Sequence, residues 1–388
     1  MRQDSTTAWA DVTLTRLQDA FPEPVRTASA PAHRRQALYI AAGDCLYAVN
    51  ANDGSARWGQ QVKQTREFTY HPRISYPPPH RMGFAAPQVV NGIVYISMEG
   101  YGAYTCAFNA DDGAPLWHTP TDGRVIAMPF LDLAAPLVGD GVVYAGTYAL
   151  NAQDGTVLWR TSIEYSVEGT LALQALVGDT LYAATHMGVC AIDVRDGHIR
   201  WRRHPDKYTH VSGASIVSDG LLYTGLSGAI GYEKQSCSYA LDTATGAEVW
   251  RYAMGDYIGA VIHDETIYIT SGSRCLYALD KRNGALRWVR QLGSPARGSA
   301  AFADGKLYIS ADGVYALNSE DGAPLWYRNL EYDRSVSFSP PVVLDGAVYV
   351  ARIDRRGRGT LYALAAHDGS EYWRIAYPSA IRPPAVVR

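Results

Sequence analysis

The sequence predicts an all-β fold, an eight-bladed β-propeller built from four-stranded antiparallel blades. Three observations predict it. One motif recurs eight times along the chain, an aromatic anchor precedes each copy, and Gly-containing turns separate the short apolar runs. The composition agrees with this interpretation, because 36 glycines and 27 tyrosines in 388 residues are typical of many strands joined by tight turns.

The recurring motif reads Tyr-Ala-Leu-Asp/Asn-x-x-x-Gly-x-x-x-Trp, and the spacing of its Tyr, Gly and Trp positions never changes. Its eight glycines are Gly54, Gly113, Gly155, Gly197, Gly246, Gly284, Gly322 and Gly369. Four residues after each glycine comes a tryptophan, namely Trp58, Trp117, Trp159, Trp201, Trp250, Trp288, Trp326 and Trp373. Seven residues before each glycine stands Tyr47, Cys106, Tyr148, Cys190, Tyr239, Tyr277, Tyr315 or Tyr362. Eight copies with one spacing indicate a repeat architecture.

Each repeat contains four predicted strands in a fixed order. An apolar segment ending in Asn-Gly or Asp-Gly is the first strand, as in AAPQVVNGIVYIS, and its turn residues supply the positive φ of a hairpin. The second strand carries the aromatic anchor, at Tyr39, Tyr95, Tyr144, Tyr182, Tyr223, Tyr268, Tyr308 and Tyr349. The YALD-like run is the third strand, and the tryptophan lies on the fourth. A four-stranded unit of about 40–50 residues is a propeller blade, which buries both its faces only against neighbouring blades.

The two ends of the chain differ from the repeat. Residues 1–25 are an N-terminal extension, for which we expect a short amphipathic helix with the apolar residues Trp9, Leu14, Leu17 and Phe21. The propeller is predicted over 26–388. Its last segment, 381–388, resembles the opening strand of a ninth unit. We therefore expect this segment to form the innermost strand of the first blade and to close the ring.

The element Ala-x-Asp-x-x-x-Gly-x-x-x-Trp resembles the tryptophan-docking motif of the PQQ-like repeat family. That family includes quinoprotein dehydrogenases and the propeller lipoprotein of the outer-membrane β-barrel assembly machinery. The resemblance covers about residues 36–388 and implies the eight-bladed architecture. It implies no particular function, because the motif is structural wherever it occurs.

For quinoprotein dehydrogenases the resemblance implies a PQQ cofactor stacked between a tryptophan and a disulfide of adjacent cysteines, beside a calcium ion. This chain has no Cys-Cys pair, and of its nine tryptophans only Trp9 lies outside the repeat. No residue can be carried over as a PQQ or calcium ligand. We therefore expect no cofactor and no metal, and a PQQ-dependent dehydrogenase is the least favoured function.

Charge and cysteine positions narrow the remaining classes. The formal net charge is −3, from 35 basic and 38 acidic residues, which does not favour nucleic-acid binding. The N-terminus has no apolar stretch long enough for a signal peptide or a membrane span. We expect a cytoplasmic monomer, or a periplasmic or extracellular one if a signal peptide was removed. The cysteines are expected to be free thiols, because Cys106 and Cys190 occupy equivalent positions in separate blades, as do Cys45 and Cys275.

The blade-to-blade connections carry the candidate site. In a propeller these connections lie on one face around the channel, together with the loops between second and third strands. They are rich in His, Tyr, Arg and carboxylate side chains, which suit a ligand pocket at the channel mouth. The candidate ligand-binding residues are His71, Tyr76, His80, Glu168, His210, Tyr257, Asp333 and Arg334. A further loop carries four arginines that suit a phosphate, a carboxylate or an acidic partner: Arg352, Arg355, Arg356 and Arg358.

Two functions fit this face. The favoured one is a recognition module without bound PQQ that binds a protein or a small-molecule ligand. The alternative is a cofactor-independent enzyme with its active site in the channel mouth, since a His or Glu with a shifted pKa suits acid–base catalysis. We favour recognition because the chain contains no HExxH, Walker A or GxSxG motif.

Overall fold

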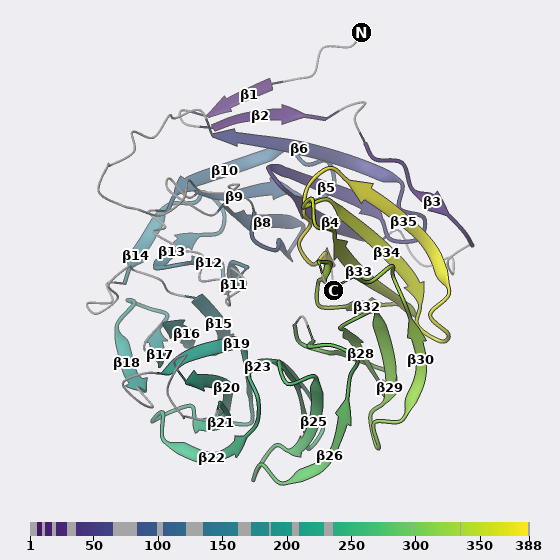
Figure 1. Ribbon diagram of the computed structural model, residues 1–388. Helices are drawn as coiled ribbons and strands as arrows, with labels where there is room; N and C mark the ends of the chain where they lie inside the picture. Colours follow the sequence, from purple (N-terminus) through teal and green to yellow (C-terminus); the bar gives the residue numbers. More distant parts are fainter. Residues whose placement is uncertain are drawn as a thin grey trace, which may run out of the picture.

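The repeats form eight antiparallel sheets arranged around a central axis (Figure 1). The computed structural model describes residues 6–9, 12–17, 21–28, 36–64, 84–98, 104–121, 135–161, 172–185, 188–203, 209–228, 236–296, 298–333 and 335–386. These residues contain β-strands and no helix. The predicted eight-bladed, all-β propeller is confirmed.

Blades 2 to 4 each have four strands that follow one another in chain order from the channel to the rim (Figure 1). Blade 2 contains β7 (Gln88–Val90), β8 (Ile93–Ser97), β9 (Tyr104–Asn109) and β10 (Pro115–Pro120). Blade 3 contains β11 (Leu137–Gly139), β12 (Val142–Ala145), β13 (Tyr148–Asn151) and β14 (Val157–Arg160). Blade 4 contains β15 (Ala172–Val177), β16 (Thr180–Thr185), β17 (Gly188–Asp193) and β18 (Ile199–Arg203).

Blades 5 to 7 repeat the same order. Blade 5 contains β19 (Thr209–Ser218), β20 (Leu221–Gly228), β21 (Cys237–Asp242) and β22 (Glu248–Ala253). Blade 6 contains β23 (Tyr257–His263), β24 (Thr266–Ser271), β25 (Cys275–Asp280) and β26 (Leu286–Gln291). Blade 7 contains β27 (Ala301–Ala303), β28 (Lys306–Ser310), β29 (Val314–Asn318) and β30 (Pro324–Arg328).

Blades 1 and 8 meet at a seam. Blade 8 contains β31 (Ser337–Phe338), β32 (Val342–Leu344), β33 (Ala347–Ile353), β34 (Gly359–Ala365) and β35 (Glu371–Tyr377). Blade 1 contains β4 (Ala37–Ala42), β5 (Cys45–Asn50) and β6 (Ala56–Gln64). Its innermost strand is β36 (Ala385–Val386), which pairs antiparallel with β4. The last strand of the chain therefore lies in the sheet of the first blade.

The N-terminal segment forms strands, so the amphipathic helix predicted within residues 1–25 is wrong. β1 (Thr6–Trp9) and β2 (Val12–Arg16) form a hairpin, and β2 pairs with the outer strand β6 of blade 1. β3 (Val25–Arg26) pairs with the outer strand β35 of blade 8. Apolar and polar residues alternate along β2, which is the period of a strand, and buried Leu14 lies opposite buried Val62. The N-terminus thus covers the outer sheet edges on both sides of the seam.

The repeat tryptophans join each blade to the next. The indole N–H of Trp58 donates to the backbone carbonyl of Ala110 in blade 2 at 2.9 Å. The other seven donate in turn to the carbonyls of Ala152, Val194, Thr243, Lys281, Ser319, Ala366 and Ala51. The last bond closes the ring, because Trp373 of blade 8 donates to Ala51 of blade 1 at 3.1 Å. Four of these rings are buried and four are partly buried: Trp58, Trp117, Trp250 and Trp373, then Trp159, Trp201, Trp288 and Trp326.

The second-strand tyrosines strengthen the same contact. Each packs on the tryptophan of its own blade with ring centroids 5.8 to 6.1 Å apart. The hydroxyl also shares the acceptor: Tyr39 donates to Ala110 at 3.0 Å, and Tyr349 donates to Ala51 at 3.1 Å. The buried hydroxyl and indole N–H are therefore satisfied by one carbonyl of the next blade.

The motif glycine is needed for two reasons. Gly113 has a φ of +72°, which side-chain-bearing residues rarely adopt. A Cβ at this position would also lie 2.5 Å from Cε3 of Trp58, well inside van der Waals contact. The tryptophan of one blade can rest on the turn of the next only where that turn carries no side chain.

Candidate functional site

The two faces of the propeller are built differently. One face, here called the hairpin face, carries the turns between first and second strands and between third and fourth strands. Asp and Asn side chains hold these turns from within: Oδ1 of Asp154 accepts the backbone N–H of Thr156 at 2.9 Å. Residues such as Asn91 and Asp140 supply the positive φ of the hairpins. This face is short-looped and repetitive.

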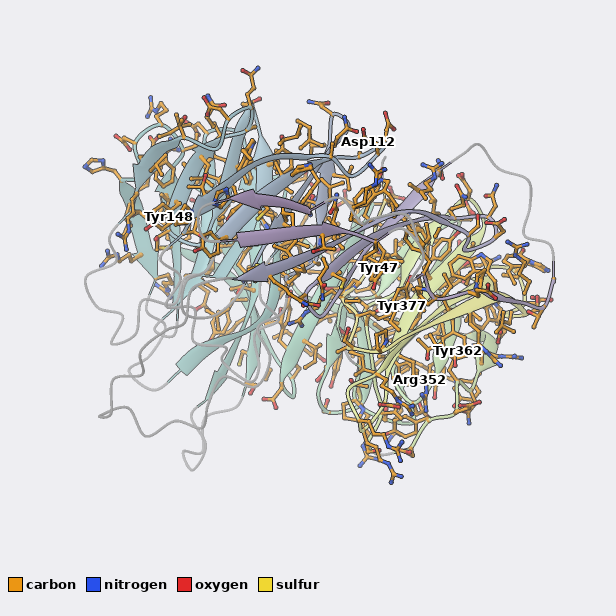
Figure 2. The ribbon with its side chains drawn as sticks, turned by 90° about the horizontal axis from the view of Figure 1, so that it is seen from above. Tyr47, Asp112, Tyr148, Arg352, Tyr362 and Tyr377 are labelled. Carbon is orange, nitrogen blue, oxygen red and sulfur yellow. The ribbon has the colours of Figure 1, made fainter. Side chains whose placement is uncertain are left out.

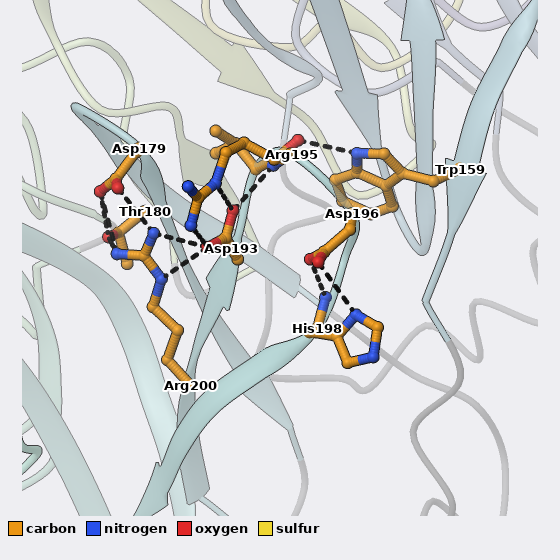
Figure 3. A network of polar contacts seen from close by, with 9 residues as sticks. Trp159, Asp179, Thr180, Asp193, Arg195, Asp196, His198 and Arg200 are labelled. Carbon is orange, nitrogen blue, oxygen red and sulfur yellow. Dashed lines mark hydrogen bonds and ion pairs between the residues drawn. The ribbon is translucent and has the colours of Figure 1, made fainter.

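A polar network at the hairpin face of blade 4 is satisfied internally (Figure 3). Arg200 forms ion pairs at 2.7 Å with both Asp179 and Asp193, and Arg195 pairs with Asp193 at 2.5 Å. Hydrogen bonds from Arg195 and then from Arg200 lower the pKa of Asp193 far below its usual range. These four charged groups satisfy one another, so the network ties two turns of one blade together.

The opposite face, here called the loop face, carries the connections between blades and the loops between second and third strands. These connections differ in length: β6 ends at Gln64 and β7 begins at Gln88, whereas β22 ends at Ala253 and β23 begins at Tyr257. In the side view of Figure 2, Asp112 of the hairpin face lies at the top and Arg352 of the loop face lies at the bottom, so the two residues are on opposite faces of the propeller. Connections of this kind can change their chemistry without disturbing the core of a scaffold.

Most of the predicted ligand-binding residues lie outside the part of the chain that the structure describes. They are His71, Tyr76, His80, Glu168 and Arg334, and their role stays a prediction. His210 lies in β19, where its backbone pairs with Ser227 of β20. The side chains of Tyr257 and Asp333 are described, and the structure places them at different blade junctions.

Tyr257 opens β23 and is enclosed between blades 5 and 6. Its side chain is 0% exposed, and its hydroxyl donates to the backbone carbonyl of Ala214 in blade 5 at 2.8 Å. The ring fits because Gly225 has no side chain: a Cβ there would lie 2.2 Å from Cβ of Tyr257. Burial raises the pKa of the Tyr257 phenol, so this hydroxyl stays protonated and joins two blades.

Asp333 lies on the connection between blades 7 and 8 and is exposed. Its Oδ1 accepts the backbone N–H of Ser335 at 2.7 Å and also the Ser335 hydroxyl. These bonds, followed by the charges of Arg352 and Arg355, hold the pKa of Asp333 below its usual range. The carboxylate therefore stays ionised at neutral pH, which suits binding or loop ordering better than general acid catalysis.

Arg352 in β33 reaches the same connection. Its Nη2 donates to the backbone carbonyl of Glu331 at 3.1 Å. Glu331 has a φ of +55°, an unusual value for a residue with a side chain, and it marks the sharp turn that precedes Asp333. Arg352 and Tyr362 of the neighbouring strand β34 lie close together in Figure 2. The junction of blades 7 and 8 thus collects carboxylate, guanidinium and phenol groups.

Sequence reasoning missed a second network, at the junction of blades 6 and 7. The Tyr315 hydroxyl donates to Oδ1 of Asp312 at 2.7 Å and accepts the backbone N–H of Gly293 at 3.3 Å. The Tyr327 hydroxyl donates to the backbone carbonyl of Asp312 at 3.1 Å. Tyr315 is a repeat position and Asp312 lies in a short Ala-Asp-Gly turn, so neither stood out in the sequence. The loop-face connection is pinned here by side chains of the following blade.

The described residues do not fit a PQQ site. Each repeat tryptophan is occupied by its contact with the next blade, and none of the five cysteines forms a disulfide. Within the described ranges, no group of three or more His, Cys, Asp or Glu side chains could hold a metal ion. A membrane-spanning helix is likewise not found in the described part of the chain.

Several solved structures share this fold at low sequence identity. Quinohemoprotein alcohol dehydrogenase from Comamonas testosteroni is 13% identical with a TM-score of 0.61, over 78% of this chain and 68% of that one. AztD from Citrobacter koseri is 10% identical with a TM-score of 0.59, over 91% and 98%. BamB from Moraxella catarrhalis is 20% identical with a TM-score of 0.49, over 81% and 97%. At these identities the likeness to the alcohol dehydrogenase and to AztD shows the fold alone.

No curated protein matches the chain. The family model described as "Outer membrane protein assembly factor BamB" matches residues 47–225, 233–343 and 311–388. These matches run through all eight blades and include every tryptophan of the repeat. The chain belongs to this family of PQQ-like repeat propellers.

Proposed function

We propose that this propeller is a recognition module that binds a partner over its loop face, without PQQ and without catalysing a reaction. The partner is a protein or a small ligand. The description of the matching family as a protein assembly factor supports a protein.

The observation that carries this proposal is the difference between the two faces. On the hairpin face the turns are short and alike, and their side chains bond within the blade, as Asp154 and Arg200 do, or to a neighbouring blade, as Lys281 does to Asp219. The loop face instead joins blades through connections of unequal length, with polar groups from neighbouring blades at each of the two junctions described above. The tryptophan ring keeps the scaffold rigid, so the loop face can present a fixed arrangement of polar groups.

Two observations favour recognition over catalysis. The loop-face carboxylates with shifted pKa values, Asp333 and Asp354, are both shifted downward, so they remain ionised instead of approaching neutrality. Tyr257 is fully enclosed between two blades with its hydroxyl bonded to Ala214, so its phenol is not available as a catalytic acid, and the same enclosure removes it from the candidate ligand contacts. A PQQ-dependent mechanism would need a stacking tryptophan, and the repeat tryptophans are committed to blade contacts.

Site-specific photo-crosslinking tests the proposal. A photoreactive amino acid is placed at one of two exposed loop-face positions, Asp256 or Ser335, in the full chain expressed in its own cells. Matched positions on the hairpin face are Gln153 and Asp321, which are also exposed. We expect a covalent adduct of one defined mass from the loop-face positions and none from the hairpin-face positions. Equal adducts from both faces, or adducts from the hairpin face alone, would overturn the proposal.

A further inference from the structure

Residues 352–358, which comprise the end of β33 and the turn that leads to β34 of blade 8, are here called the arginine loop. Asp354 holds it in shape: Oδ1 accepts the backbone N–H groups of Arg356 at 2.8 Å and of Arg358 at 2.9 Å. Oδ2 accepts Nε of Arg358 at 2.8 Å, and the two side chains form an ion pair. One of the four guanidinium groups is therefore used to build the loop.

The other three guanidinium groups have no carboxylate partner within the described part of the chain. Among the described residues, no ion pair within 4.0 Å involves Arg352, Arg355 or Arg356, and the last two are exposed. Arginines elsewhere in the propeller are commonly paired, as Arg287 is with Asp280 at 2.8 Å and Arg374 with Glu371 at 3.5 Å. Asp333 acts on Arg352 and Arg355 only through its charge, without an ion pair, so the three neighbouring guanidiniums outnumber this carboxylate and attract further anions.

Arg352 supplies a second, independent observation. It is only partly exposed, and its Nε is buried with no hydrogen-bond acceptor among the described residues. A buried donor on a charged group that lacks an acceptor costs more free energy than a neutral one. Asp333 lies nearby, but its Oδ1 already accepts two bonds from Ser335. An incoming anion would supply an acceptor oxygen to Nε of Arg352 and further negative charge to all three guanidinium groups.

We propose that the arginine loop binds an oxyanion through Arg352, Arg355 and Arg356, and that the partner of the loop face carries this group. The inference rests on the proposed function and names the chemistry of its ligand. Guanidinium forks bind carboxylate and phosphate oxygens in bidentate fashion, which a lysine cannot do. The oxyanion can come from an acidic polypeptide segment or from a free small anion, and the experiment separates these sources.

Calorimetric titration of the full chain with two probes tests the proposal, a glutamate-rich peptide and citrate, at low ionic strength. The double variant Arg355→Ala/Arg356→Ala should weaken binding by about tenfold for each guanidinium removed. The matched control is Arg202→Ala/Arg290→Ala, which removes two exposed arginines from the outer strands β18 and β26. It should bind within about twofold of the parent, because screened charges far from the ligand contribute little.

A third variant, Arg352→Lys, keeps the charge but removes Nε and should lose several-fold in affinity. Binding of the peptide alone identifies an acidic polypeptide as the source, and binding of both probes identifies any oxyanion. The inference fails if neither probe binds the parent, or if the double variant and its control bind alike. Crosslinks confined to the loop face would still support the recognition function in that case. Failure of the oxyanion proposal can therefore be told apart from failure of the recognition proposal.

Discussion

Replacing Gly113 by alanine tests how the blades are joined. The alanine must adopt a φ of +72°, which costs about 1–2 kcal/mol in backbone strain. Its Cβ would also lie 2.5 Å from Cε3 of Trp58, whose side chain is only 2% exposed and has no room to move. Displacing such a ring costs a further ~1–3 kcal/mol. We therefore expect Gly113→Ala to lower the free energy of unfolding by roughly 2–5 kcal/mol.

The chain offers a matched control for this change. Gly141 has nearly the same φ, +76°, but a Cβ there would meet nothing within 4 Å. Gly141→Ala should therefore lose only the backbone contribution of about 1–2 kcal/mol. Urea unfolding followed by far-ultraviolet circular dichroism measures both values. If the two variants lose the same stability, the tryptophan does not rest on the glycine as described, and the packing argument is refuted.

The remaining predictions concern the ring, the seam, the arginine loop and the cofactor. Trp288→Ala should lower the free energy of unfolding in urea by about 3–5 kcal/mol. Trp373→Phe keeps an aromatic ring but loses the hydrogen bond to Ala51, so its loss should exceed the loss from reduced apolar burial by about 1 kcal/mol. Deleting residues 381–388 removes β36 and should cause aggregation or a large fall in melting temperature; a deletion protein that melts like the parent contradicts this. The hydrogen bond from the backbone N–H of Arg358 is the largest cause that lowers the pKa of Asp354 to about 2. As pH falls from about 4 to 2, the free energy of unfolding of the parent should therefore fall relative to that of Asp354→Asn. A difference between the two proteins that does not change with pH would contradict this role of Asp354. Purified protein should bind PQQ no better than unrelated proteins do, and stoichiometric, calcium-dependent binding in an absorbance titration would overturn this.

The repeat could be predicted because its contacts lie at fixed sequence spacing. Gly113 and Trp58 illustrate this: each belongs to a motif that any reader of the sequence can align, and their contact repeats from blade to blade. The N-terminal strands could not be predicted in this way. β2 and β3 are fixed by the free sheet edges that they cover, and those edges exist only once the ring has formed.

The sequence could predict which face of the propeller carries the candidate site, but not which side chains form it. The sequence indicates that connections such as 329–336 lie at the channel mouth, but the backbone decides which side chains turn inward. Tyr257 shows the difference, since Gly225 of the neighbouring blade admits its ring to the interior. Arg352 is a second example. Its Nη2 bonds to the backbone of Glu331 and its Nε is buried, and the sequence pattern predicts neither feature.

Hydrogen–deuterium exchange can map the face that the partner covers. The partner identified through the loop-face crosslinks is added to the full chain, and exchange is compared with and without it. We expect slower exchange in the loop-face connections, including residues 329–336 and the arginine loop. No change is expected in the hairpin turns, such as those around Asp154 and Asp321. Protection confined to the hairpin turns or to the outer strands of the rim would contradict recognition by the loop face.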